Sequence, residues 1–130
     1  MSKKSEGVIA DSLDNRWTVT HAPAAAATIV ASVSAPQSAR SQHNLETLSY
    51  TIRNGAGATH TVTTSVRAVS VAGTVLASWD DLVPTVSSVL RHLPNLGIRP
   101  ANGEALVFTQ DTVLANVKCT LNASGWTSQE

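Results

Sequence analysis

The chain has 130 residues, and its nine Lys or Arg residues balance nine Asp or Glu residues, so the formal net charge is zero. This balance provides no basic surface of the kind that binds nucleic-acid phosphates or anionic lipid headgroups, so we expect neither nucleic acid nor membrane as a partner. The length fits one domain, and a composition dominated by β-branched Val and Thr together with Ala and Ser, with only 4% aromatic residues, favours sheet over helix.

Residues 1–15 are polar and show no clear periodicity. We interpret them as an N-terminal arm that becomes ordered only when another surface holds it. The arm contains Lys3 and Lys4 but no long apolar segment, so a secretory signal is not expected. The single cysteine, Cys119, excludes an internal disulfide, and we expect a protein made in a cytoplasm.

The first two strands are predicted at residues 16–21 and 24–33. Alternation in the first segment places Trp17 and Val19 on one face. A run of four alanines opens the second segment, but Pro23 precedes it and β-branched residues follow, so we predict a strand there rather than a helix. Residues 34–44 are small and polar and predict a loop.

The clearest hairpin is predicted from residues 45–53 and 59–69, which are joined by the turn sequence Asn-Gly-Ala-Gly. The inner face of its first strand consists of Leu48, Tyr50 and Ile52. The inner face of its second strand consists of Val62, Val66 and Ala68.

Four more strands are predicted at residues 74–79, 86–93, 104–109 and 112–121. Asp80 and Asp81 are predicted to end the first of these at a bend, and residues 122–130 are predicted to leave the sheet. About eight short alternating strands separated by turn signals predict an all-β fold, an antiparallel β-sandwich or jelly roll. We place this domain at 16–126, with the arm before it and 127–130 as a C-terminal tail.

No catalytic, cofactor or metal site is predicted. The four histidines, His21, His43, His60 and His92, do not follow the spacing of metal ligands, and each is interpreted as a half-exposed strand or loop residue. The two adjacent aspartates would point to opposite faces of a strand and make a poor acid–base pair. Cys119 lies in the inward phase of the last strand and is interpreted as a small core residue. A cupin-like enzyme remains an alternative, and it requires the four histidines to converge.

The three tryptophans admit two interpretations. Trp79 lies in an inward strand phase and is interpreted as structural, whereas Trp17 and Trp126 lie near the two ends of the domain and could pack against each other or against a neighbouring chain. The alternative is an aromatic platform for sugars. We predict partner contacts at Lys3, Lys4, Arg16, Trp17 and Trp126.

Several turn-and-strand phrases carry a family resemblance: Leu48–Gly57, Val66-Arg67, Gly73–Trp79, Leu96–Arg99, Leu106–Phe108 and Ala115–Trp126. With these phrases, residues 16–126 resemble the jelly-roll cement, or decoration, proteins of tailed bacteriophages. The resemblance implies a non-enzymatic protein without a cofactor, made in the host cytoplasm and located on the capsid exterior of the virion.

The resemblance also implies two partners. One is the major capsid protein, whose subunits the protein would clamp together, and the other is the protein itself as a homodimer or homotrimer. The alternative function is a carbohydrate- or receptor-binding β-sandwich module of a virion fibre or tail.

Overall fold

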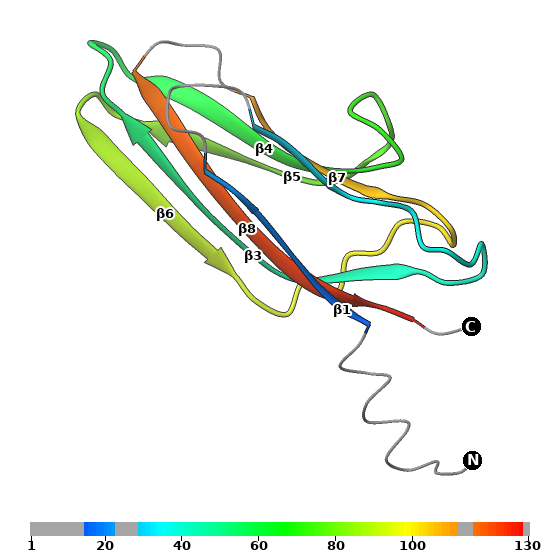
Figure 1. Ribbon diagram of the computed structural model, residues 1–130. Coiled ribbons are helices and arrows are strands. Elements are labelled where there is room, and N and C mark those ends of the chain that lie inside the picture. Colours follow the sequence, from blue (N-terminus) through cyan, green and yellow to red (C-terminus); the bar gives the residue numbers. More distant parts are fainter. Residues whose placement is uncertain (1–14, 23–28, 112–115, 129–130) are drawn as a thin grey trace.

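The computed structural model describes residues 15–22, 29–111 and 116–128. In these ranges the chain forms eight strands and no helix (Figure 1). The strands are β1 (Arg16–His21), β2 (Ile29–Val33), β3 (His43–Asn54), β4 (His60–Ala68), β5 (Val75–Val83), β6 (Ser87–Leu93), β7 (Leu106–Asp111) and β8 (Val117–Thr127). The described part of the chain therefore contains no helix that could cross a membrane.

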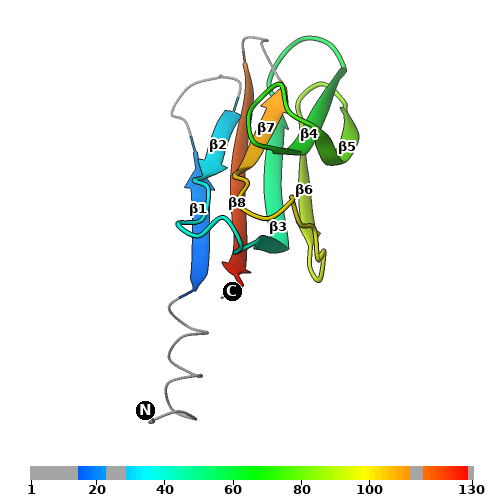
Figure 2. The ribbon, with the colours of Figure 1, turned by 90° about the vertical axis from the view of Figure 1, so that its right-hand side faces the viewer.

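The strands form two four-stranded antiparallel sheets, with the orders β1-β8-β3-β6 and β2-β7-β4-β5. Successive strands change sheets at every connection except the β4–β5 hairpin, which is the strand order of a jelly roll. Figure 2 shows β1 and β2 along one side of the sandwich and β5 and β6 along the other. The predicted antiparallel sandwich of about eight strands is confirmed.

The space between the sheets is filled by the inward side chains of alternate residues. This core consists of Leu45, Leu48, Tyr50, Ile52, Val62, Val66, Val83, Leu106, Phe108, Val117, Cys119, Leu121 and Ala123. The predicted inward phases of β3 and β4 are therefore confirmed. The predicted hairpin between them is wrong, because β3 pairs with β6 and β8 in one sheet and β4 pairs with β5 and β7 in the other. Each fully buried aliphatic or Phe side chain contributes about 1.5–3 kcal/mol to folding, so this cluster is the main source of stability.

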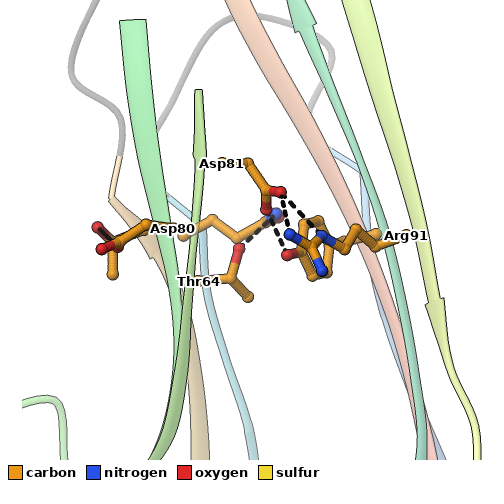
Figure 3. A network of polar contacts seen from close by, with 7 residues as sticks. Thr64, Asp80, Asp81 and Arg91 are labelled. Atoms are coloured by element: carbon orange, nitrogen blue, oxygen red, sulfur yellow. Dashed lines mark hydrogen bonds and ion pairs between the residues drawn. The ribbon is translucent and has the colours of Figure 1, made fainter. Parts of the chain in front are cut away.

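The predicted bend at Asp80 and Asp81 is wrong, because β5 continues through both residues to Val83. The two carboxylates do point to opposite faces, as expected for neighbours on a strand (Figure 3). Asp80 accepts a hydrogen bond from the Thr63 hydroxyl at 2.6 Å on the outer face, and Asp81 has partners inside the sandwich. These partners offset the low preference of aspartate for strands.

The predicted exit from the sheet after residue 121 is also wrong, because β8 continues to Thr127. It pairs with β1 on one side and with β3 on the other, so both of its backbone edges are hydrogen-bonded along this extension. Residues 112–115 of the predicted last strand, residues 24–28 of the predicted second strand and residues 1–14 of the predicted arm lie outside the described residues.

Candidate interaction surfaces

Two of the predicted contact residues, Arg16 and Trp126, lie side by side. They are directly opposite each other in the β1–β8 pairing, so their side chains share the outer face of the β1-β8-β3-β6 sheet. The Arg16 guanidinium forms an ion pair with the Glu46 carboxylate at 3.0 Å, and both side chains are exposed, by 57% and 38%. An exposed pair of this kind contributes about 0–1 kcal/mol, so it orients Arg16 more than it stabilises the fold.

Trp17 lies on the other side of the same sheet. Its indole packs against the core with its centroid 5.9 Å from the His43 ring and 6.4 Å from the Phe108 ring. The opposite residue on β8 is Gly125, and the absence of a side chain there makes room for the Trp17 ring. Trp17 and Trp126 therefore face opposite sides and do not pack together. Lys3 and Lys4 lie outside the described residues.

The outer face of the β1-β8-β3-β6 sheet is almost entirely polar, and we call it the polar face. The pairing registers assign to it, besides Arg16 and Trp126, Thr18, Thr20, Thr47, Ser49, Thr51, Arg53, Ser88, Leu90, His92, Lys118, Thr120, Asn122 and Ser124. Hydroxyl and amide groups from all four strands thus form one continuous surface.

Hydrogen bonds between neighbouring strands hold several of these side chains in place. The Thr20 hydroxyl donates to the side-chain oxygen Oδ1 of Asn122 at 2.9 Å, and the Ser49 hydroxyl is 2.8 Å from Nδ1 of His92. These four residues form a row across all four strands. Side chains that are already fixed lose less conformational entropy on binding, so the row is suited to hydrogen bonding with another protein surface.

Two cations lie directly opposite each other on the polar face. Arg53 of β3 pairs in register with Lys118 of β8, and both residues are exposed. Within the described residues neither side chain has a carboxylate partner. Like charges at opposed positions destabilise a sheet, so folding gains nothing from this pair. A shallow groove of about 220 Å³ adjoins it, lined by Arg53, Asn54, Gly55, Val86, Ser87 and Ser88.

A buried polar network connects the two sheets at the side where β5 and β6 lie (Figure 3). The Tyr50 hydroxyl donates to Asp81 at 2.5 Å, and Arg91 donates to the same carboxylate from Nε and Nη2 at 2.8 Å each. Burial is the largest cause that raises the pKa of Tyr50, and the hydrogen bond to Asp81 raises it further. The hydrogen bond to Asp81 and its charge raise the pKa of Arg91. The phenol and the guanidinium are therefore protonated at neutral pH, and their hydrogen bonds to Asp81 hold the two sheets together.

The network was missed from the sequence because Asp81 was assigned to a bend. The signal was present, however, since Asp81 continues the inward phase of Ala77 and Trp79. Gln110 extends the network and donates to the Thr64 hydroxyl at 3.3 Å. Its Oε1 is buried and has no hydrogen-bond partner among the described residues.

The four histidines lie on four different strands, His21 on β1, His43 on β3, His60 on β4 and His92 on β6. His92 belongs to the polar face, whereas His43 is only 4% exposed, with Nδ1 2.8 Å from the Thr127 hydroxyl and Nε2 2.7 Å from the Ser34 carbonyl oxygen. The prediction that every histidine is half-exposed is therefore wrong for His43. Among the described residues, no group of three or more His, Cys, Asp or Glu side chains could hold a metal ion.

Cys119 is 1% exposed, and burial raises the pKa of its thiol to about 11. At neutral pH it is therefore an unreactive thiol, and its place in the core is the one predicted from its strand phase.

A larger groove, of about 480 Å³, lies where β1 begins and β8 ends, and Trp17, His43 and the loop after β2 contribute to its walls. The Trp17 ring is engaged by His43 and Phe108. It is therefore not a free stacking platform of the kind that a sugar-binding module presents.

No family model and no curated protein matches the sequence. Among solved structures, the chain is similar to a protein of Bacillus endospore appendages, which form a novel family of disulfide-linked pili. The TM-score is 0.40 at 16% sequence identity, over 88% of this chain and 87% of that chain. The jelly-roll assignment above depends on the strand pairing of this chain and not on that similarity.

Proposed function

We propose that the chain is a non-enzymatic structural protein that binds the outer surface of a phage capsid and stabilises the contacts between major capsid proteins. The observation that carries the proposal is the polar face, a continuous surface on a jelly-roll sandwich whose hydroxyl and amide groups are partly hydrogen-bonded between neighbouring strands. The turn-and-strand phrases that resemble phage cement proteins also support it. Jelly rolls build viral capsid proteins as well as lectins and cupins, so the surface rather than the fold must carry the function.

A cement protein acts by adding buried area across a subunit boundary. An interface of standard size buries about 1,600 Å² in total, and many copies on one particle add their contributions. The polar face suits this role because its side chains are uncharged for the most part and offer both donors and acceptors. Such a surface binds at a low cost of charge desolvation.

The pair Arg53 and Lys118 would determine the orientation of binding. Two cations without a carboxylate partner among the described residues are complementary to acidic groups on a capsid surface, and such complementarity sets specificity and association rate. The partner we infer therefore presents carboxylates opposite this end of the face.

The test is the addition of purified protein to phage heads that lack a cement protein. We expect saturable co-sedimentation with the heads and a higher temperature of head disruption. Lys118→Thr should weaken binding by about tenfold, which corresponds to 1.4 kcal/mol. Thr61→Glu is the matched control, since it changes the net charge by the same amount on the outer face of the other sheet and should bind normally.

Absence of binding to the heads would contradict the proposal. Binding to glycans without binding to heads would instead support the fibre or tail module. Equal losses with Lys118→Thr and Thr61→Glu would show that general charge, and not the polar face, governs attachment.

A further inference from the structure

Each sheet of the sandwich has two edge strands, and the four edges differ in how they are protected. An open edge presents unpaired backbone N–H and C=O groups to other chains, and proteins protect such edges with short strands, charges or bulges. β2 has only five residues, β1 begins with Arg16, and β5 carries two aspartates and a register shift against β4. β6 has seven residues and contains no Pro, Lys, Asp or Glu.

The one charged residue of β6, Arg91, does not protect this edge. An inward charge blocks strand addition when it would be buried without a partner. Arg91 already donates twice to Asp81 inside the same chain, so its charge stays compensated when a strand is added.

Exposed apolar residues in and near β6 also indicate that another protein surface covers this edge. Leu90 is 75% exposed, and Val86, which precedes the strand, is 83% exposed. Leu90 is the middle residue of β6 and the one large aliphatic side chain that the strand directs to the polar face. Its burial against another apolar side chain would contribute about 1.5–3 kcal/mol per copy.

We propose that β6 pairs antiparallel with β6 of a second copy, about a two-fold axis that passes through Leu90. The two four-stranded sheets would then join into one continuous sheet. The pairing is self-complementary, as a two-fold interface requires. Leu90 would lie opposite Leu90 of the partner subunit, and Ser88 opposite His92 of the partner subunit, a hydroxyl–imidazole combination that the chain already uses between Ser49 and His92. The polar faces of both copies would then form one surface.

This inference goes beyond the proposed function, and it is tested on the isolated chain, so capsid binding and pairing can fail separately. Sedimentation equilibrium should show a dimer of the unmodified protein. Leu90→Lys should weaken this dimer by about tenfold or more, because it removes the apolar contact and places two lysines with Cβ atoms about 5 Å apart directly opposite each other across the axis. Thr18→Lys is the control, since it adds the same charge to the same face at the opposite edge, on β1.

A cysteine at the axis tests the register. Leu90→Cys should give a disulfide-linked dimer under mild oxidation, whereas Thr18→Cys should stay uncrosslinked. The native Cys119 is buried and should not contribute. A monomeric unmodified protein, an unchanged dimer with Leu90→Lys, or a dimer in which Leu90→Cys does not crosslink would each overturn the proposal. Circular dichroism would verify that the variants are folded.

Discussion

The Tyr50 hydroxyl of β3 donates a hydrogen bond of 2.5 Å to the Asp81 carboxylate of β5, and this bond crosses the core from one sheet to the other. Tyr50 is 1% exposed and Asp81 6%, so water cannot replace either partner. Arg91 of β6 completes the charge balance from the edge of the sandwich. The two sheets are thus connected by defined polar contacts at Asp81 as well as by apolar packing.

Tyr50→Phe should therefore lower the free energy of unfolding by about 1.5–3 kcal/mol, the range for a hydrogen bond to a charged group. Urea denaturation measures the change. Asp81→Ala removes the acceptor, so Tyr50→Phe should cost much less in that background. Equal costs in the two backgrounds would show that the hydroxyl acts through something other than Asp81.

Gly125→Ala should be strongly destabilising, because an added Cβ would lie 2.1 Å from the Asn44 carbonyl oxygen and 2.6 Å from Cζ2 of Trp17. Neither the backbone nor the packed indole can move without disturbing the sheet, so we expect a loss of about 3 kcal/mol. Gly57→Ala is the matched control, since nothing lies within 4 Å of its added Cβ, and it should change stability by less than about 0.5 kcal/mol. Thermal unfolding of both variants would distinguish them, and similar melting temperatures would contradict the expected clash.

Stability should fall in alkaline solution, in part because of Cys119. The usual pKa of the thiol is 9.0, and burial raises it to about 11 in the folded chain. Ionisation between these two values therefore favours the unfolded chain. The contribution is complete below pH 9 and is lost as the pH rises through 11, at a total of about 3 kcal/mol.

Denaturation measured from pH 8 to 11 would check this dependence. Tyr50, whose pKa is also raised, acts in the same direction in both proteins. Cys119→Ala should therefore show a shallower fall than the unmodified chain, and identical slopes would exclude the thiol as a cause.

Lys118→Glu should stabilise the chain by about 0.2–1 kcal/mol, because it converts a like-charge pair with Arg53 into an opposite-charge pair. The double variant with Arg53→Glu restores like charges and should lose this gain. Chemical denaturation at low and high salt measures the effect, which should shrink as salt screens the exposed charges. A gain that persists in the double variant would show that the charge pairing is not its source.

Much of the fold could be predicted from local patterns. Strict alternation in residues 45–53 and 59–69 identified the strands β3 and β4 and their inward side chains, because a half-buried strand must alternate. It did not identify their partners: the turn signal between them predicted a hairpin, whereas the chain crosses there from one sheet to the other. The two boundary errors, at Asp80–Asp81 and after residue 121, have one cause. Aspartate, glycine and asparagine are read locally as turn residues, but partners that are distant in the sequence held these segments in strands.

The candidate surfaces could be predicted only in part. Arg16 and Trp126 were expected to contact a partner, and they do share an outer face, whereas Trp17 belongs to the core side. The polar face, the opposed Arg53 and Lys118, and the open β6 edge could not be read from the chain, since each requires knowing which strands are neighbours.

The sequence by itself determined the class of fold, since the period of alternation and the β-branched composition permit little other than a sandwich of short strands. The tertiary structure alone decided the order of the strands, the partner of Asp81 and the face on which each exposed side chain lies. The physical reason is that alternation fixes which side chains share one side of a strand, whereas strand order and register depend on contacts between residues far apart in the chain.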